Sequence, residues 1–315
     1  MIWLIGNKGM LGTEIEAQFK ERQSRDMTSV AGHDPNSPEF GIVSQNAPEC
    51  DYIATDLETD ITNSACLHEF AAPLPLTWII NCAAYTAVDR AEDEPERAYR
   101  INAEGPLNLA QVAAAKGARL IHISTDYVFD GARDAPYAEE DLPCPLGAYA
   151  AGKCQGERNI ADHLDAHFII RSAWMYGKNG PNFVHTMLRL FRERDEVSVV
   201  ADQWGSPTYA PDLAAAIMTI IEADSTAYGI YHFTNAGRIN WHQFATAIYD
   251  LAQKNGLLTK SVKILPITTA QYPTKAKRPQ YAYLSKEKIC RTFNIKLTPW
   301  QDSLAAFLST MSPSP

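Results

Sequence analysis

Two pairs of residues in this chain have the side chains and spacing needed to move a proton to or from a carbonyl group. Tyr149 and Lys153 lie four residues apart in a predicted helix over residues 148–163, so they share one helix face. An ammonium beside a phenol favours the phenolate, which predicts a lowered pKa for Tyr149 and suits it to acid–base catalysis. Ser124 and Thr125 follow the apolar run 120–123, where the Thr125 hydroxyl is placed to bond the same substrate oxygen.

The N-terminal segment predicts a site for a dinucleotide. An apolar run over residues 2–5 leads into Gly6, Gly9 and Gly12, and a helix is expected over residues 11–21. Glycines let the backbone turn sharply near a ligand, and the N-terminus of the following helix attracts a pyrophosphate. The spacing Gly-x-x-Gly-x-x-Gly differs from the commonest dinucleotide fingerprint, so a merely structural turn is the alternative. Its place directly after the first strand favours the dinucleotide site.

These residues need a sheet that brings strand ends together, and the first half of the chain predicts one. Short apolar strands alternate with helices, which is the pattern of a parallel sheet with helices on both faces. We therefore expect an α/β fold with a doubly wound, parallel Rossmann-type sheet over residues 1–173. The expected strands are 2–5, 52–55, 78–82, 120–124 and 168–171, and the expected helices are 11–21, 64–70, 94–116 and 148–163.

Residues 23–50 interrupt this alternation. The stretch carries Ser, Asn, Pro and Gly without clear periodicity, which predicts an insertion between the first helix and the second strand. Within it, residues 28–31 offer a short strand of their own. A surface loop is the simplest interpretation of the remainder, because loops tolerate insertions better than the elements they connect.

The second half of the chain, residues 174–315, predicts a smaller C-terminal substrate-binding lobe. Its segment 197–223 is expected to cross back to the Rossmann-type domain, and the Pro-, Lys- and Tyr-rich segment 265–283 is expected to be a loop. Ligands of open α/β sheets bind beyond the carboxyl ends of the strands, so the cleft should lie between the lobes. The remaining expected elements are helices 182–194, 211–223 and 241–254 and strands 197–200 and 229–234.

Composition excludes several classes of protein. The chain has 315 residues, 46% of them hydrophobic, and its net charge of −9 disfavours a nucleic-acid partner. No apolar run has the length of a membrane span, and a strand beginning at residue 2 leaves no room for a signal peptide. Six scattered cysteines without a Cys-x-x-Cys pair indicate free thiols in the cytoplasm and no metal site. We interpret Asp89, Glu92 and Glu94 as a solvated acidic patch.

The order of glycine turn, strand-terminal Ser-Thr and Tyr-x-x-x-Lys resembles the extended short-chain dehydrogenase/reductase superfamily. Longer blocks narrow the resemblance to the dTDP-4-dehydrorhamnose reductase family, from residue 1 to about residue 308 apart from 23–50. These blocks are residues 81–92 (NCAAYTAVDRAE), 124–131 (STDYVFDG), 171–176 (RSAWMY), 202–208 (DQWGSPT) and 276–279 (AKRP).

The resemblance implies an NAD(P)H-dependent oxidoreductase that reduces the 4-keto group of dTDP-6-deoxy-L-lyxo-4-hexulose to give dTDP-L-rhamnose. It makes Tyr149 the proton donor, Lys153 its partner and a holder of the nicotinamide ribose, and Thr125 the residue that orients the keto oxygen. Hydride comes from the nicotinamide, so the protein's task is placement and charge stabilisation. Further implied cofactor contacts are Gly6, Gly9, Met10, Leu11 and Gly12 at the pyrophosphate, Asp60 and Ile61 at the adenine, and Ala83, Ala84 and Tyr85 beside the ribose and nicotinamide.

The adenosine ribose has two candidate partners. Asp56 ends the expected strand 52–55, whereas Asp34 takes its place if residues 28–31 form the second strand. We favour Asp56, because Thr55-Asp56 followed by Asp60-Ile61-Thr62 resembles the family's block. Family members often carry a basic residue after this aspartate, but the chain has Leu57. Since phosphate recognition favours a cation, the residues favour NADH over NADPH without excluding NADPH.

On the substrate side, the resemblance assigns Trp174 to the sugar nucleotide, with a core tryptophan as the alternative, and Arg278 to its diphosphate. Ser124 and Thr125 are the other substrate contacts that the resemblance implies. Asn182 and Gln203 are weaker candidates that are equally explained as polar surface residues. We expect His122 to be a packed histidine rather than a base, and Cys82 to be a small apolar filler.

Other activities use the same fold, so function must be argued from the site. Sugar-nucleotide 4,6-dehydratases place an Asp-Glu pair after the strand-terminal threonine, and here Asp126 is followed by Tyr127 instead. A 4-epimerase remains an alternative, as does a regulatory subunit resembling the methionine adenosyltransferase beta subunit. The sequence distinguishes neither a monomer from a homodimer nor a dependence on Mg²⁺.

Overall fold

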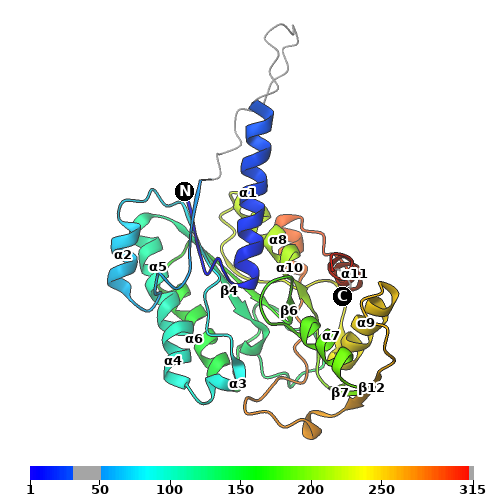
Figure 1. Cartoon of the computed structure of the whole chain (residues 1–315). Helices are drawn as coiled ribbons and strands as arrows, with labels where there is room; N and C mark the ends of the chain where they lie inside the picture. The colour runs from blue at the N-terminus through cyan, green and yellow to red at the C-terminus, as the bar shows by residue number, and fades with distance from the viewer. Residues whose placement is uncertain (31–50, 312–315) are drawn as a thin grey trace, which may run out of the picture.

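The computed structural model describes residues 1–30 and 51–311, and its centre is a six-stranded parallel sheet (Figure 1). The strand order is β10-β5-β4-β3-β1-β2, and each neighbouring pair is parallel. This confirms the Rossmann-type sheet and each of the strands expected in the first half of the chain. The strands are β1 (Ile2–Ile5), β2 (Tyr52–Thr55), β3 (Trp78–Asn81), β4 (Arg119–Thr125), β5 (His167–Ser172) and β10 (Gly229–His232).

Helices cover both faces of this sheet, because alternate residues of the strands point to opposite sides. In β1, Ile2 and Leu4 pack into one core with α1 and α8, whereas Trp3 and Ile5 pack into another with α2 and α5. Figure 1 shows these two helical layers on either side of the sheet. The helices of the two layers are α1 (Met10–Val30), α8 (Ala210–Glu222) and α10 (Glu287–Phe293) on one side and α2 (Ser64–Ala71), α5 (Gly105–Lys116) and α6 (Ala148–His163) on the other.

The first helix is longer than the sequence predicts. It continues to Val30, so the strand expected over residues 28–31 is wrong for residues 28–30, and Ala31 lies outside the described residues. The competing candidate Asp34 also lies outside them. The second strand of the sheet is Tyr52–Thr55, which pairs with β1 and puts Asp56 at its carboxyl end.

The helical stretch expected over residues 94–116 is divided into three parts. It consists of α4 (Pro95–Tyr99), a π-helical turn (Arg100–Glu104) and α5, and a short helix α3 (Val88–Ala91) precedes it. The π turn lies against α6, the helix that carries Tyr149 and Lys153. Asn102, in this turn, is buried and bonds both backbone groups of Tyr85, which fixes the loop after β3.

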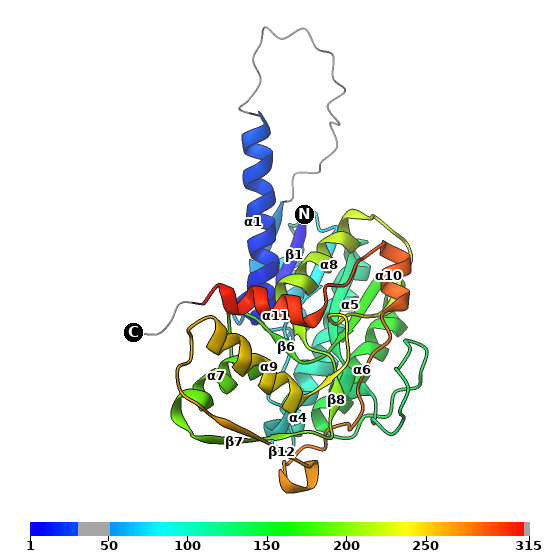
Figure 2. The same cartoon turned by 90° about the vertical axis from the view of Figure 1, so that its right-hand side faces the viewer.

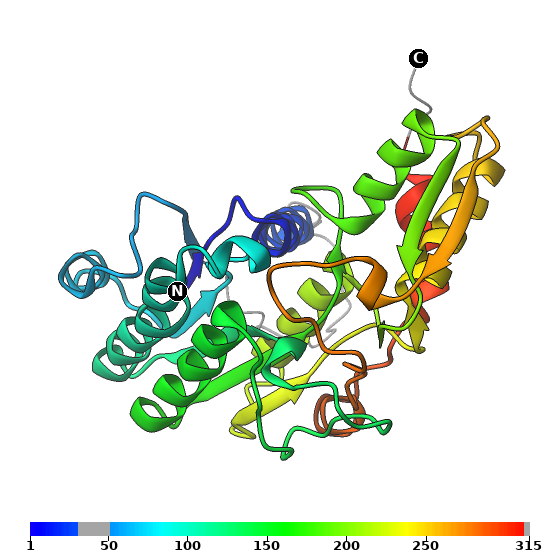
Figure 3. The same ribbon diagram turned by 90° about the horizontal axis from the view of Figure 1, so that it is seen from below.

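The second lobe has its own apolar core, built from α7 (Phe183–Glu193), α9 (Trp241–Lys254) and α11 (Trp300–Ser309). A parallel pair, β7 (Glu196–Val200) and β12 (Lys263–Ile267), covers this core (Figures 2 and 3). The loop expected over residues 265–283 is therefore wrong at its start, which is a strand followed by a 3-10 turn over Thr269–Gln271. Short strands complete the lobe and its connections: β6 (Met175–Tyr176), β8 (Trp204–Gly205), β9 (Thr208–Tyr209) and β11 (Ile239–Asn240).

The chain passes repeatedly between the two lobes, because α8, β10 and α10 pack in the first lobe and α9 and α11 in the second. After β7 in the second lobe, α8 returns to pack on α1, and β10 then extends the edge of the central sheet beside β5. Within residues 1–30 and 51–311, no helix combines the length and apolar character that crossing a bilayer requires.

Candidate active site

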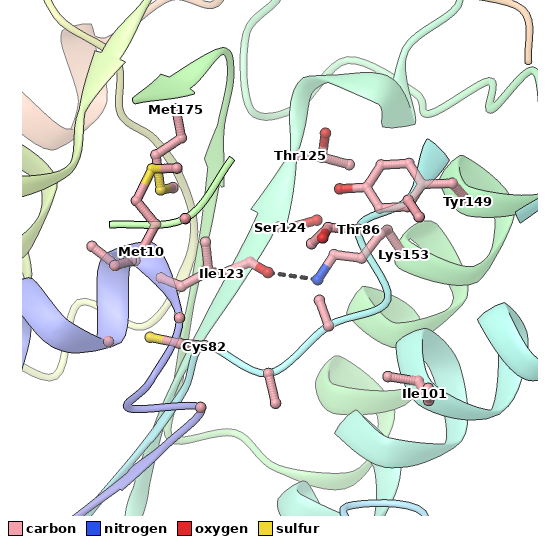
Figure 4. Close-up of a pocket in the computed structure, with 18 of the residues that line it drawn as sticks. Met10, Cys82, Thr86, Ile101, Ile123, Ser124, Thr125, Tyr149, Lys153 and Met175 are labelled. Atoms are coloured by element: carbon pink, nitrogen blue, oxygen red, sulfur yellow. Dashed lines mark hydrogen bonds between the residues drawn. The ribbon is translucent and has the colours of Figure 1, made fainter. Parts of the chain in front are cut away.

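A cleft of about 1160 Å³ lies at the carboxyl ends of the central strands, between the sheet and the second lobe. The glycine turn, the end of β4 and the first turns of α6 line it, as do Trp174 and Trp241 from the side of the second lobe. In Figure 4, Thr125, Tyr149 and Lys153 lie close together on one side of this cleft, and Met10 and Cys82 lie on the other. The structure thus brings Thr125, at the end of β4, next to the Tyr-x-x-x-Lys pair on α6.

The glycine turn has the geometry of a backbone cradle. Gly6 has a φ of 80°, and a side chain there would lie 2.8 Å from the Ala83 nitrogen at the end of β3. A Cβ at Gly12 would lie 2.1 Å from the Gly6 carbonyl oxygen, because α1 starts directly above the turn. The first turn of α1 carries no acidic residue, so its N–H groups and dipole face the cleft without a competing carboxylate. These features fit a bound pyrophosphate, which a side chain at Gly12 would displace.

Tyr149 contradicts one expectation from the sequence. Its pKa is raised to about 12, chiefly because the phenol is removed from water, although the Thr125 hydroxyl acts in the opposite direction. The predicted lowering of the Tyr149 pKa by Lys153 is wrong, because removal of the phenol from water is the largest influence on it. At neutral pH Tyr149 is therefore a phenol with a proton to give, which is the form a carbonyl reduction needs.

Lys153 is held from below by strand β4. Its Nζ donates to the Ile123 carbonyl oxygen at 2.6 Å, the bond drawn in Figure 4, and lies 3.1 Å from His122 Nε2. Burial lowers the pKa of Lys153 to about 8, while the nearby Glu157 acts in the opposite direction. His122 is fully buried, as expected for a packed histidine, but it is bonded to Lys153 and is more than packing.

The Ser124 hydroxyl is bonded to a residue that does not line the cleft. This hydroxyl donates to Glu157, and that carboxylate forms a fully buried ion pair with Arg171 at 2.7 Å. Buried charges are tolerated only when they are paired, so this network fixes β4, β5 and α6 against one another. Ser124 and Thr125 both line the cleft, and both hydroxyls are already bonded. The partner of Ser124 is Glu157, whereas Thr125 donates to Asp126 and accepts from the Tyr127 N–H.

Asp126 is a site residue that the sequence reasoning passed over. It is 2% exposed and lines the cleft, and its Oδ2 has no hydrogen-bond partner within residues 1–30 and 51–311. Burial raises its pKa to about 7, although the Thr125 hydroxyl donates to its other oxygen at 3.0 Å. Its position directly after a parallel strand is a signal that could have identified it.

Asp56, Asp60 and Ile61, which the sequence assigns to the adenosine, line the same cleft. Leu57 is 90% exposed and supplies no charge, in agreement with the sequence. A cation is nevertheless present, since Lys8 Nζ lies 4.0 Å from Asp56 and 3.5 Å from Glu58. A positive charge beside Asp56 therefore comes from the glycine turn, so the absence of a basic residue at position 57 does not by itself favour NADH over NADPH.

The segment after β3 is divided between the cleft and the protein interior. Ala83 and Ala84 line the cleft as expected, and so does Cys82, whose thiol has a pKa raised to about 12 by burial and stays neutral. Tyr85 is not among the lining residues. Its hydroxyl donates to Glu94 at 3.2 Å, and both of its backbone groups are bonded to Asn102.

Known proteins resemble this chain over most of its length. A family model described as the RmlD substrate binding domain matches residues 1–312. The dTDP-4-dehydrorhamnose reductase of Aggregatibacter actinomycetemcomitans is 42% identical over 78% of this chain and 85% of that protein. The chain belongs to the dTDP-4-dehydrorhamnose reductase family. The Salmonella typhimurium reductase is 38% identical over 84% of this chain and 91% of its own length.

Solved structures of dTDP-4-dehydrorhamnose reductases show the same fold over nearly the whole chain. The Bacillus anthracis protein, solved in complex with NADP, is 35% identical with a TM-score of 0.82 over 97% of both chains. The Clostridium acetobutylicum protein is also 35% identical, with a TM-score of 0.84 over 98% of both chains. A dTDP-glucose 4,6-dehydratase from Streptomyces venezuelae matches at 18% identity, which shows the shared fold alone.

The family resemblance assigned substrate contacts to Trp174 and Arg278, and the structure separates the two. Trp174 lines the cleft with a φ of 47°, and its ring stacks on Trp241 at 3.6 Å. Arg278 does not line the cleft. Its two terminal guanidinium nitrogens donate to Asp89, at 2.6 and 3.1 Å. A role for Arg278 in binding diphosphate would require this ion pair to open.

Two weaker candidates are buried rather than polar surface residues. Asn182 accepts from the His185 N–H at the start of α7, and Gln203 donates to Thr269. Both hold the second lobe together, and neither lines the cleft.

The acidic patch has structural partners. Asp89 binds Arg278, Glu92 accepts from the N–H of Ala148 at the start of α6, and Glu94 pairs with Arg90. In the described part of the chain, no group of three or more His, Cys, Asp and Glu side chains is arranged to hold a metal. The cysteines of that part are free thiols: Cys66, Cys82, Cys144, Cys154 and Cys290.

Proposed function

We propose that this protein catalyses the NAD(P)H-dependent reduction of the 4-keto group of dTDP-6-deoxy-L-lyxo-4-hexulose to dTDP-L-rhamnose. The observation that carries this proposal is the grouping of Thr125, Tyr149 and Lys153 in one cleft beside the glycine turn. The names of the relatives support the choice of substrate, and the NADP complex of the Bacillus anthracis relative supports the class of cofactor.

The chain's own residues supply the proton and the positioning. A bound reduced nicotinamide supplies the hydride. Tyr149, protonated because its pKa is about 12, donates its proton to the substrate oxygen, and Thr125 orients that oxygen. The Lys153 ammonium is held by the Ile123 carbonyl, where it stabilises the negative charge that develops on the phenol oxygen. Asp126, with a pKa near 7 and one unbonded oxygen, is suited to accept a hydrogen bond from a sugar hydroxyl.

We further propose that the enzyme accepts both NADH and NADPH. We assign Asp56 to the hydroxyls of the adenosine ribose. The Lys8 side chain is 67% exposed and pairs with Asp56 and Glu58, and it would exchange one of these carboxylates for a 2′-phosphate. Gly9, Met10 and Leu11 are assigned to the pyrophosphate, and Asp60 and Ile61 to the adenine. An enzyme of the cytoplasm is in keeping with the free thiols of the described residues.

On the substrate side, Trp174 and its stacking partner Trp241 form an aromatic wall suited to a nucleotide base or a sugar face. We propose that Trp174 contacts the sugar nucleotide, and that Ser124 acts mainly by holding Thr125 in place. Arg278 joins the site only if the diphosphate displaces Asp89.

A turnover assay distinguishes this function from the alternatives. The purified protein is given the 4-keto sugar nucleotide with NADH and with NADPH in parallel, and loss of the reduced cofactor is compared with product formed. The proposal predicts one cofactor oxidised for each dTDP-L-rhamnose made. Conversion of the sugar nucleotide without net oxidation of the cofactor would indicate an epimerase, and binding without turnover would indicate a regulatory subunit.

A further inference from the structure

A line of buried polar groups runs behind Lys153, away from the cleft. Asn81, at the end of β3, is 1% exposed, and His122, in the middle of β4, is fully buried. Asn81 Nδ2 lies 2.9 Å from His122 Nδ1, and His122 Nε2 lies 3.1 Å from Lys153 Nζ. Neither Asn81 nor His122 lines the cleft, so neither is a direct ligand contact.

The donors and acceptors in this line can be assigned from one end. The Ala83 backbone N–H donates to Asn81 Oδ1 at 3.0 Å, and a backbone nitrogen can only donate. This bond fixes the Asn81 amide with its NH₂ group toward His122. Nδ1 of His122 must therefore accept, so its ring proton is on Nε2, which points at Lys153.

The contact between His122 Nε2 and Lys153 Nζ is then a hydrogen bond in only one protonation state of the lysine. A proton on His122 Nε2 requires a lone pair on Lys153 Nζ, and only the neutral amine has one. An ammonium would place N–H against N–H, although it could still donate to the Ile123 carbonyl. An imidazolium at His122 is disfavoured as well, because it would place a second N–H against the Asn81 amide.

We propose that His122, locked as its Nε2–H tautomer by Asn81, is a positioning residue that donates to the neutral amine of Lys153 and so makes its ammonium readily lose a proton. The other groups that face Lys153 are Glu157 on α6 and Cys82 after β3, and a negative charge on either would favour the ammonium. Burial of Lys153 and its contact with His122 favour the neutral amine instead. Burial is the largest cause both of the Lys153 pKa near 8 and of the strongly lowered pKa of His122.

The consequence for catalysis rests on the proposed function. Each reduction moves one proton from Tyr149 to the substrate oxygen and leaves a phenolate. One proton from the Lys153 ammonium then restores the phenol, and the resulting amine accepts the bond from His122 until water protonates it again. A lysine with a pKa near neutrality gives up that proton more easily than one with its ordinary value.

The tautomer is tested directly by ¹⁵N NMR on histidine-labelled protein, with the His122 signals assigned by their loss in a His122→Asn variant. We expect a protonated Nε2 and an unprotonated Nδ1 in the native protein at neutral pH. Asn81→Asp should reverse them, because a carboxylate can only accept and would draw the proton to Nδ1. A native His122 that carries its proton on Nδ1, or that is an imidazolium, would overturn the proposal whether or not the protein is a reductase.

The effect on Lys153 is tested by the pH dependence of kcat, since a merely structural role for His122 would not move it. Reduction should decline as pH rises through the pKa of Lys153. In Asn81→Asp that decline should move up by about one to two pH units, since His122 Nε2 would now accept from the ammonium. Asn81→Ser removes the lock without adding charge and should move it in the same direction by less. A profile unchanged in both variants would contradict the proposal.

Discussion

One methyl group at Gly12 is expected to abolish most dinucleotide binding. A Cβ there would lie 2.1 Å from the Gly6 carbonyl oxygen and 2.7 Å from the Asn7 Cα, whereas ordinary contact begins near 3.4 Å. Both atoms belong to the backbone of the turn, so either the turn or α1 must move by more than 1 Å. A misplacement of about that size costs on the order of a hundredfold where geometry matters, so we expect the Kd for NADH to rise by about ten- to a hundredfold.

The assay is a fluorescence titration of NADH with the native protein and Gly12→Ala, after circular dichroism has shown that the variant is folded. Gly117→Ala is the control, because Gly117 ends α5 outside the cleft and its Cβ would meet no atom within 4 Å. The control should bind NADH as the native protein does. A native Kd in Gly12→Ala would refute the argument that the backbone of this turn holds the cofactor.

Two further predictions concern charge. Lys8→Ala should raise the KM for NADPH by about five- to tenfold at low salt and leave the KM for NADH nearly unchanged. The reason is that an exposed ammonium acts mainly on the added 2′-phosphate. An unchanged ratio of the two KM values would show that Lys8 does not contact the cofactor. Asp126 has a pKa of about 7 in the fold against 3.8 in the unfolded chain, so the folded state binds its proton more tightly and stability falls as pH rises between these values. At pH 8 the free energy of unfolding of Asp126→Asn should therefore exceed that of the native protein by at most about 4 kcal/mol, and near pH 4 the two should be equal. Urea unfolding checks this, and the same difference in free energy at both pH values would contradict it.

The parts of the fold that could be predicted are those whose residues are buried on both faces. β3 and β5 are buried throughout, so they appear in the sequence as short apolar runs between turns. β12 (KILPI) could not be predicted with the same ease, because its short apolar run contains Pro266, which is unfavourable inside a strand, and it pairs only with β7 at an exposed edge. The C-terminal part of α1 was missed because residues 22–30 are mostly polar and lack the apolar spacing of a packed helix.

The spacing of the motifs predicts which residues lie together in the cleft, but it does not predict their hydrogen bonds and ion pairs. Tyr149 and Lys153 share a helix face and Thr125 ends a strand, and these facts are local. The approach of Lys8 to Asp56 depends on β1 and β2 being neighbours, and the pairing of Arg278 with Asp89 joins residues 189 positions apart. The direction of a pKa shift depends on burial, which the sequence alone did not provide for Tyr149.

The most direct test of the central claim, that Tyr149 gives its proton to a substrate beside a cofactor bound at the glycine turn, is a single-turnover measurement with Tyr149→Phe. The variant is first titrated with NADH and then mixed with the 4-keto sugar nucleotide. We predict a Kd for NADH close to the native value and a rate of NADH oxidation lowered by about a hundredfold or more. A native rate in this variant would show that another group is the proton donor.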